Sequence, residues 1–319
     1  MSEQKGLITC LILSGGLIRE NVKKAIIGKD EVIDLMLMAL ISSGHVLIED
    51  VPGLGKTTLV SALAKSLGCS FQRIQFTPDV LPSDITGFNM FDIKTGEKTF
   101  HKGSAFNQII LADEINRASP KTQSALLEAM QEKQVTVDLK TYALPAPFIV
   151  MATQNPVEMA GTYPLPEAQI DRFLMKISVG YPSKEAEKEI LKMKKSPAVS
   201  SEITQVADTS DLLELQKAAS EVKIDDSLME YIISLVEATR NFDGVLSGCS
   251  PRASIALMQA SCAKALIEGR NYVVPDDIKF LAPYVLTHRI ILKSRFGAGG
   301  LTAQKVIEDI LKTVKIPKN

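Results

Sequence analysis

The stretch His45–Thr58, with the sequence HVLIEDVPGLGKTT, decides the fold of this chain. Its first five residues predict a short strand, and the residues from Lys56 onward predict a helix. Between them, Gly53 and Gly55 allow backbone N–H groups to converge on anionic oxygens without a clash from Cβ. The helix N-terminus adds a partial positive charge. This arrangement predicts a phosphate-binding loop.

The side chains of this loop favour the same interpretation. Lys56 can reach the outer phosphates of a nucleotide, and the hydroxyl of Thr57 can bind magnesium. One position departs from the usual pattern, which has a glycine where this chain has Asp50. The alternative is a turn that contains Gly-Lys-Thr by chance. The predicted nucleotide-binding residues of the loop are Pro52, Gly53, Leu54, Gly55, Lys56, Thr57 and Thr58.

Short apolar runs alternate with helical patterns in the first half of the chain, which predicts a parallel α/β sheet. After Tyr181-Pro182 the pattern becomes helical throughout. We therefore expect a nucleotide-binding core over residues 1–182, including an N-terminal helical segment, and a helical domain over 183–319. The expected strands are 45–49, 71–75, 109–112, 148–152 and 173–179, and the expected helices are 56–67, 121–132, 183–195, 226–240 and 251–268.

Two acids follow the expected strand 109–112, which begins some fifty residues beyond the phosphate loop. Ligands of open α/β sheets bind at the carboxyl edge of the strands, where Asp113 and Glu114 would lie. Asp113 can hold magnesium, and Glu114 can polarise an attacking water as a general base. Two solvated acids at a strand end are the alternative, and the phosphate loop before them favours the catalytic pair.

Three polar residues further along are weaker candidates. Asn155 follows the strand 148–152 and could orient water or touch the γ-phosphate, or stand in an ordinary turn. Arg172 has the planar fork that suits phosphate, or it forms a local salt bridge. Arg252 lies in the first turn of the expected helix 251–268, from which it could reach back to the nucleotide, or it is a surface arginine.

The bulk composition excludes several classes of protein. Lys and Arg number 36 against 37 Asp and Glu, and no nucleic-acid-binding module is recognisable, so we expect no nucleic-acid partner. The four cysteines form no CxxC pair and the three histidines no metal pattern, which favours buried, reduced thiols and a cytoplasmic protein. The apolar segment Gly6–Ile18 is too short to span a bilayer, and we expect no membrane span.

The ordered motifs resemble those of the AAA+ superfamily, and the residues within them resemble the MoxR family in particular. The resemblance extends over most of the chain. The matching segments are GHVLIEDVPGLGKT at 44–57, QFTPDVLPSDITG at 75–87, LADEINRA at 111–118, MATQNP at 151–156, GTYPLPEAQIDRF at 161–173 and SPRA at 250–253.

The resemblance implies a P-loop AAA+ core, with a parallel sheet flanked by helices, followed by a small all-α lid domain. It implies that ATP and Mg²⁺ are the cofactors and that two insertions, 87–103 and 135–145, face the pore or the upper surface of a ring. The implied roles are phosphate and magnesium binding for Lys56 and Thr57, magnesium binding for Asp113, catalytic base for Glu114, polar sensor for Asn155, arginine finger for Arg172, lid sensor for Arg252 and adenine contacts for Ile26, Ile27 and Gly28.

The resemblance also implies a function, an ATP-hydrolysing motor that remodels or matures partner proteins in a chaperone-like way. The chain is then expected to form a homo-oligomeric ring, with six members as the commonest number, and to work with proteins that carry von Willebrand factor A domains. The alternatives are a metal-chelatase-type motor, a nucleic-acid-remodelling motor, and an ATP-gated scaffold with little turnover.

Overall fold

The computed structural model describes residues 15–91, 93, 96–156, 161–195, 203–293 and 300–316. Most of the apolar segment Gly6–Ile18 lies outside these residues. The described part of the first helix covers residues 15–23.

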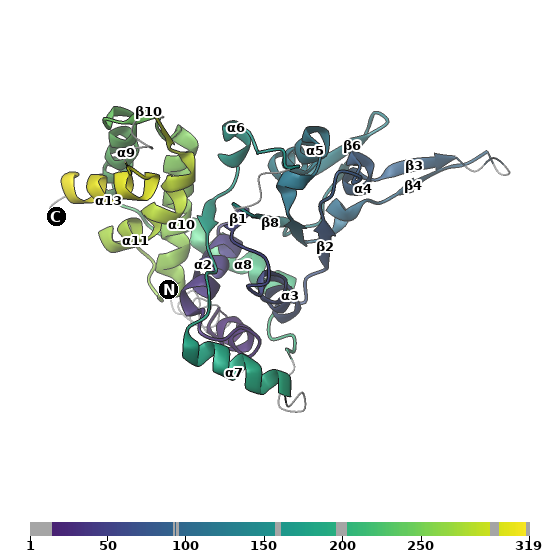
Figure 1. Cartoon of the computed structure of the whole chain (residues 1–319), viewed down its shortest axis with the longest axis horizontal. Helices are drawn as coiled ribbons and strands as arrows, with labels where there is room; N and C mark the ends of the chain where they lie inside the picture. Colours follow the sequence, from purple (N-terminus) through teal and green to yellow (C-terminus); the bar gives the residue numbers. More distant parts are fainter. Residues whose placement is uncertain are drawn as a thin grey trace.

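A five-stranded parallel sheet forms the centre of the molecule (Figure 1). Its spatial order is β2-β5-β8-β1-β9, so the strand before the phosphate loop lies between β8 and β9. The strands are β1 Val46–Glu49, β2 Phe71–Gln75, β5 Ile109–Asp113, β8 Ile149–Gln154 and β9 Met175–Ile177. The five expected strands are confirmed, with ends that differ by a few residues, and so is the parallel α/β fold.

Alternation along the strands gives the sheet two buried faces. In β5, Ile109 and Leu111 join one hydrophobic cluster, while Ile110 and Ala112 join the other. The first cluster includes α2 (Asp30–Ile41) and α3 (Lys56–Ser66). The second includes α4 (Pro82–Thr86) and α5 (Pro120–Glu132). The sheet is therefore held between helices on both faces, and its polar strand ends remain at the edges.

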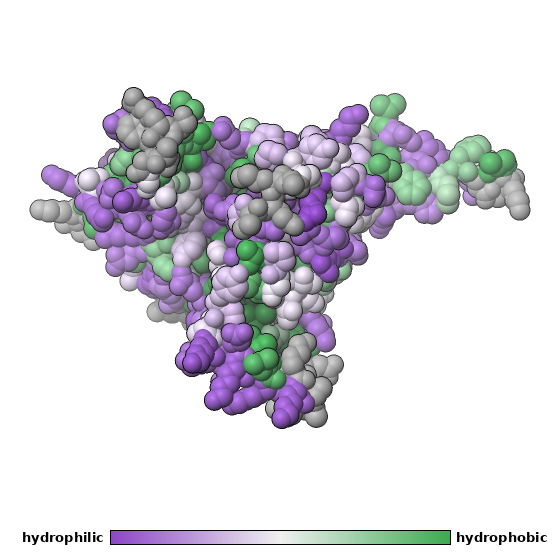
Figure 2. Space-filling view, viewed as in Figure 1, coloured by the Kyte–Doolittle hydropathy of each residue, from purple (hydrophilic) through white to green (hydrophobic). Residues whose placement is uncertain are grey.

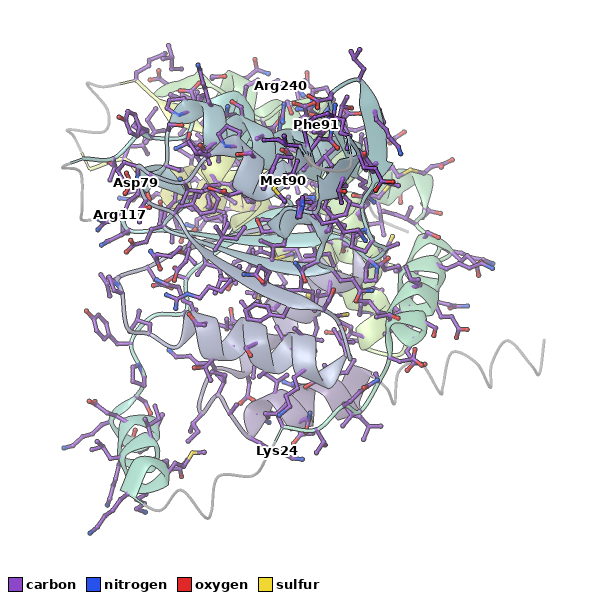
Figure 3. All side chains as sticks on the ribbon, turned by 90° about the vertical axis from the view of Figure 1, so that its right-hand side faces the viewer. Lys24, Asp79, Met90, Phe91, Arg117 and Arg240 are labelled. Atoms are coloured by element: carbon purple, nitrogen blue, oxygen red, sulfur yellow. The ribbon has the colours of Figure 1, made fainter. Side chains whose placement is uncertain are left out.

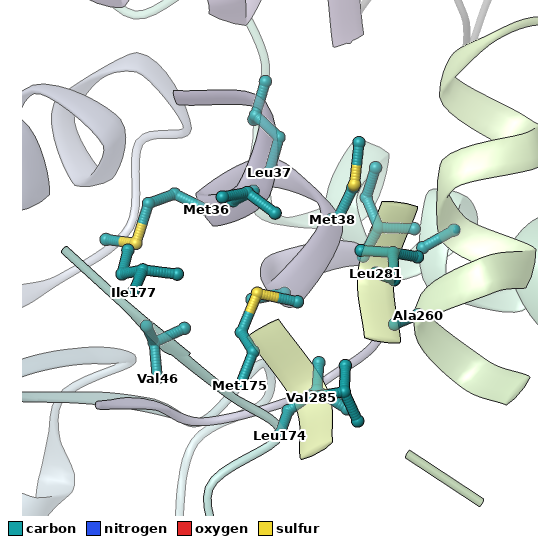
Figure 4. Close-up of a cluster of buried hydrophobic side chains, with 14 of the residues drawn as sticks. Met36, Leu37, Met38, Val46, Leu174, Met175, Ile177, Ala260, Leu281 and Val285 are labelled. Atoms are coloured by element: carbon teal, nitrogen blue, oxygen red, sulfur yellow. The ribbon is translucent and has the colours of Figure 1, made fainter. Parts of the chain in front are cut away.

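Helices dominate after β9, as predicted. They are α7 Lys184–Lys195, α8 Thr209–Ser220, α9 Asp226–Asn241, α10 Pro251–Ile267, α11 Pro275–Leu286 and α13 Ala303–Thr313, and a short pair of strands, β10 Val245–Ser247 and β11 Ile291–Leu292, joins them. Figure 4 shows α2 as the bridge between this helical part and the sheet. Met36 and Met38 of α2 lie in one cluster with Met175 of β9 and with Leu281 and Val285 of α11.

A hairpin occupies each of the two expected insertions. One is β3 (Phe88–Phe91) with β4 (Lys98–His101), and it projects far from the body of the molecule in Figure 1. The other is β6 (Gln134–Val137) with β7 (Lys140–Ala143). Phe100 stacks on Tyr142 with ring centroids 4.0 Å apart, so the two hairpins support each other.

Within the described ranges, no helix combines the length and the apolar character that crossing a membrane requires. Cys69, Cys249 and Cys262 are free thiols, and all three are buried. Burial raises the pKa of Cys69 and of Cys262 to about 11, which keeps both thiols protonated. Cys10 lies outside the described residues.

Candidate functional site

The phosphate loop has the backbone that its glycines predict. Gly53 and Gly55 have φ angles of +87° and +82°, a region that favours glycine. Gly55 is the N-cap of α3, so the helix begins where the loop ends. No atom lies within 4 Å of the place where a Cβ on Gly53 would stand. The backbone conformation, and not crowding by neighbouring atoms, therefore favours a glycine at this position.

Lys56 begins α3, and its amine lies within the curve of the loop. Its Nζ donates hydrogen bonds of 3.0 Å to the carbonyl oxygens of Asp50 and Val51. The residue is only 9% exposed, so its charge points into the site and not into bulk solvent. An ammonium group held in this way can exchange loop carbonyls for phosphate oxygens at little cost.

Asp50, which departs from the usual loop pattern, has a defined partner set. Its carboxylate accepts hydrogen bonds from the hydroxyl of Ser178 at 2.7 Å, from the N–H of Val179, and from the N–H of Gly180 at 3.3 Å. These three residues follow β9 directly and precede α7. The carboxylate therefore ties the start of the phosphate loop to the connection between the sheet and the helices beyond it.

Asp113 ends β5 beside the loop and is 9% exposed. Its Oδ1 accepts a 2.6 Å hydrogen bond from the hydroxyl of Thr153 on β8. Its Oδ2 accepts hydrogen bonds from Arg73 on β2, at 3.1 Å from Nε and 2.8 Å from the terminal nitrogen. Three adjacent strands thus fix the orientation of this carboxylate.

Glu114 follows Asp113 with a φ angle of +56°, an uncommon value for a residue with a side chain. Its N–H donates to the hydroxyl of Thr153 at 2.8 Å, which holds the turn in place. Its carboxylate accepts a 3.0 Å hydrogen bond from Gln75 and pairs with Arg117 at 2.8 Å. Arg117 is labelled in Figure 3.

These groups line a single cavity of about 300 Å³. The cavity brings together the loop, the two acids and the end of β8, including Asn155. Its lining residues are Asp50, Pro52, Gly53, Gly55, Lys56, Thr57, Thr58, Arg73, Gln75, Asp113, Glu114, Thr153, Gln154 and Asn155.

The residues expected around adenine flank the loop. The Cδ1 of Ile26 lies 3.8 Å from the place where a Cβ on Gly55 would stand. Gly28 has a φ angle of +69°, and a Cβ there would lie 3.1 Å from the Cβ of Ala186 on α7. Ile27 is half-buried beside them, and Leu54 of the loop packs against the larger hydrophobic cluster. Ile26 therefore lies beside the loop, whereas none of these three residues lines the phosphate-loop cavity.

The two candidate arginines lie elsewhere in the structure. Arg252 does not line the phosphate-loop cavity of its own chain. It lines a second cavity of about 320 Å³ together with Arg172. The cause lies in the tertiary structure, because α10 packs against α2 and α8 and its N-terminus faces the segment that precedes β9. His45, at the opposite end of β1 from the phosphate loop, also lines this cavity.

A backbone carbonyl of α5 holds Arg172 in this second cavity. One terminal nitrogen donates a 2.8 Å hydrogen bond to the carbonyl of Leu127 on α5. Its Nε is buried and has no hydrogen-bond partner among the described residues. The local salt bridge considered as the alternative is absent from the described contacts of Arg172, because Asp171 pairs with Arg289 instead, at 2.7 Å.

Two family models match the chain. The ATPase family associated with various cellular activities matches residues 45–175, and the AAA lid domain matches residues 237–310. The chain is 44% identical to Chaperone MoxR1 of Mycobacterium tuberculosis, a similarity that covers 93% of this chain and 81% of the relative. The chain belongs to the MoxR family of AAA+ ATPases.

Two further similarities extend over nearly the whole MoxR-family chain. Protein YeaC of Bacillus subtilis, which is uncharacterised, is 50% identical over 298 residues, or 93% of each chain. The crystal structure of a candidate ATPase from Cytophaga hutchinsonii superposes with a TM-score of 0.93 at 42% identity and covers 99% of both chains.

The sequence of this MoxR-family chain did not lead us to three residues of the site. Thr153 holds both Asp113 and the backbone of Glu114, while Arg73 and Gln75 each contact one of the two acids. A signal was present in β2, where two long polar residues stand two positions apart near the end of a strand. Such spacing places both side chains on the same face of the sheet.

Proposed function

We propose that this MoxR-family chain hydrolyses ATP at a site that two neighbouring subunits share. The observation that carries the proposal is the separation of the two cavities. One chain places Lys56, Asp113 and Glu114 in one cavity, whereas Arg172 and Arg252 lie in another. A site divided in this way becomes complete when the arginine cavity of one subunit faces the phosphate loop of the next.

The residues of the first cavity support each part of the reaction. Lys56 and the N–H groups of the loop would bind the phosphates, and Ile26 and Gly28 would flank the base. Glu114 would accept a proton from the attacking water, and Asn155 would orient that water. Gln75 and Arg117 already hold the Glu114 carboxylate at the side of the cavity.

The donor set fits magnesium. The hydroxyl of Thr57 and the carboxylate of Asp113 line the same cavity, and Mg²⁺ commonly takes one or two protein oxygens and completes its shell with water and phosphate. Bound there, the ion would neutralise charge on the phosphate oxygens. Arg73 must first release Asp113, which it contacts at 2.8 Å.

The arginines support an inter-subunit role. A guanidinium group supplied to a phosphoryl transfer site can be worth on the order of 10³ to 10⁵ in rate. Arg172 has a buried Nε without a partner in the described part of the chain, and Arg252 extends into the same cavity. A head-to-tail contact of this kind closes into a ring, for which six members is our expectation.

Remodelling of partner proteins is part of the same proposal. The projecting hairpin of β3 and β4 exposes four large apolar side chains, and the most exposed is Ile93 at 91%. They are Phe88, Met90, Phe91 and Ile93. Figure 2 shows hydrophobic residues gathered near the tip of this projection. Met90 and Phe91 are also labelled in Figure 3. Apolar side chains on a projecting arm suit contact with unfolded or apolar segments of a client.

The remaining expectations also belong to the proposal. They are a core over residues 1–182 and a lid over 183–319, a cytoplasmic location, and partners with von Willebrand factor A domains. The change from strands to helices after β9 supports the domain boundary. The buried, protonated thiols of Cys69 and Cys262 are compatible with a reducing compartment.

The test is ATP hydrolysis per subunit across a wide range of protein concentration. We expect a rate that rises cooperatively with concentration, and that collapses in both Glu114→Gln and Arg172→Ala. A rate that is independent of concentration and unchanged in Arg172→Ala would contradict the shared site. Tight ATP binding without turnover in the wild type would favour an ATP-gated scaffold.

A further inference from the structure

Asp171 stands immediately before Arg172, and its carboxylate has partners from two separate segments of the helical part. Its Oδ1 accepts a 2.7 Å hydrogen bond from the Nε of Arg289. Its Oδ2 accepts a 2.9 Å hydrogen bond from the hydroxyl of Ser250. One carboxylate therefore joins the segment that bears Arg172 to two elements that lie far away in the sequence.

Arg289 is the anchor of this junction. It ends the 3-10 turn η4 (Thr287–Arg289) and is only 8% exposed. One terminal nitrogen donates to the carbonyls of Asp171 and Phe173, at 3.2 and 2.6 Å. The other donates to the carbonyls of Leu174, at 3.2 Å, and Val285. The guanidinium thus fixes the backbone on both sides of Arg172.

Ser250 connects the same carboxylate to the second arginine. It is the N-cap of α10, and its hydroxyl oxygen accepts a 3.2 Å hydrogen bond from the N–H of Arg252 while donating to Asp171. The guanidinium of Arg252 lies 4.0 Å from the same Asp171 oxygen. The position of Arg252 relative to Arg172 is therefore set through Asp171.

We propose that Asp171, held by Arg289 and Ser250, is the positioning residue that places Arg172 and Arg252 as one unit to act on the nucleotide of the neighbouring subunit. This inference rests on the proposed shared site. It adds that neither arginine is placed independently, because a single carboxylate sets the geometry of both. Loss of that carboxylate misplaces both guanidinium groups and leaves the phosphate loop of the same chain intact.

The loop is expected to remain intact because the two cavities have no lining residue in common. Asp171 lines the arginine cavity and not the phosphate-loop cavity. A displacement of about 1 Å in a positioned catalytic group can cost on the order of 10²-fold in rate. The expected signature is thus a loss of turnover without a loss of nucleotide affinity.

The experiment compares Asp171→Asn with Arg172→Ala, alone and in mixed rings. We expect Asp171→Asn to lower kcat about 10²-fold, and to leave the affinity for ATP of dilute subunits within about twofold of the wild type. The matched control is Glu167→Gln, an exposed acid in the preceding short helix α6 (Glu167–Ile170), which should leave kcat unchanged.

Mixing with Lys56→Ala subunits separates positioning from misfolding. Those subunits lack a working phosphate loop but carry an intact arginine cavity, so they can complete the site of an Asp171→Asn subunit. In an equal mixture about one quarter of the interfaces pair a working loop with a working arginine cavity. We expect activity to return to about that fraction of the wild-type rate, as it should for Arg172→Ala mixed with Lys56→Ala.

Each outcome decides between distinct alternatives. If the Arg172→Ala mixture regains activity and the Asp171→Asn mixture does not, the positioning role is wrong while the shared site stands. If neither mixture regains activity, the shared site itself is wrong. If Asp171→Asn does not fold, Ser250→Ala takes its place, with an expected loss in kcat of about three- to tenfold. An equal mixture with Lys56→Ala subunits should then raise the rate per Ser250→Ala subunit to at least about half of the wild-type rate.

Discussion

The phosphate-loop cavity and the arginine cavity lie near opposite ends of β1 and are assembled in different ways. The first is built where neighbouring parallel strands end, from short continuous motifs such as Pro52–Thr58 and Asp113-Glu114. The second is built from segments that are distant in the sequence, among them Ser42–His45, Asp171-Arg172 and Arg289.

This difference has a functional meaning. The first cavity holds a lysine and two carboxylates, and the second holds Arg172 and Arg252, which do not line the first. In the proposed function, the first set binds and activates, and the arginines act on the neighbouring subunit. Two half-sites of complementary charge favour contact between copies of the chain. Four predictions test this division, in order of expected effect.

Lys56→Ala should have the largest effect and should act on the first cavity alone. Loss of charge-assisted hydrogen bonds, at about 1.5–3 kcal/mol each, should weaken ATP binding by dilute subunits at least about a hundredfold. Nucleotide titration at low protein concentration measures it. Lys65→Ala, an exposed lysine in the same helix, is the control and should bind normally.

Acidification should lower the stability of the folded protein through His45, which lines the arginine cavity. The ring of His45 accepts a hydrogen bond from the N–H of Val150 at 2.9 Å and donates one to the carbonyl of Met130 at 3.1 Å. Burial lowers the pKa of His45 to about 4, from 6.5. The folded state therefore binds fewer protons than the unfolded state below pH 6.5, and stability should fall as the pH drops from 6.5 to 4.

Between pH 6.5 and pH 4, the contribution of His45 should lower the free energy of unfolding by about 3 kcal/mol. Chemical denaturation at several pH values measures it. His45→Asn should be less stable at pH 7 but should show a shallower decline toward pH 4. His288 is half-buried by its neighbours, and desolvation lowers its pKa as well, so some decline should persist in the variant. An identical slope in both proteins would exclude His45 as the cause.

Arg252→Ala should show which chain this arginine serves. We expect kcat to fall about ten- to a hundredfold in assembled protein, while dilute subunits bind ATP with unchanged affinity. Ile255→Ala, one turn along α10 in the same cavity, should change neither quantity appreciably. Weaker binding by dilute Arg252→Ala subunits would instead place this arginine at the nucleotide of its own chain.

Arg73→Ala should have the smallest effect and sharpens the description of the first cavity. Its ion pair with Asp113 is half-exposed on the arginine side, so the pair contributes little. In the proposed site, Arg73 competes with Mg²⁺ for the carboxylate of Asp113. Its removal should therefore lower the Mg²⁺ concentration for half-maximal nucleotide binding about two- to fivefold. Arg117→Ala, which removes an equal charge beside Glu114, should leave this midpoint in place. A raised midpoint in Arg73→Ala would show that Arg73 assists the ion.

Much of the fold was predictable from local patterns. The strand β2 at Phe71–Gln75 was predicted to the residue, because Phe71 and Ile74 favour a strand in a short run that lies between Gly68 and Pro78. The helix α8 (Thr209–Ser220) was not predicted, although Asp208 caps it with hydrogen bonds to Ser210 and Asp211. Much of its stability comes from packing against α2 and α10, which no local pattern reveals.

The sequence alone determined the phosphate loop, the acid pair and the family, since each depends on residues that are close together along the chain. Only the tertiary structure decided that Arg252 shares a cavity with Arg172, and that Thr153 and Arg73 hold Asp113. The physical reason is that these contacts depend on strand order and on helix packing, which bring residues 40 to 80 positions apart within hydrogen-bonding distance. Spacing along the chain carries no record of such distances.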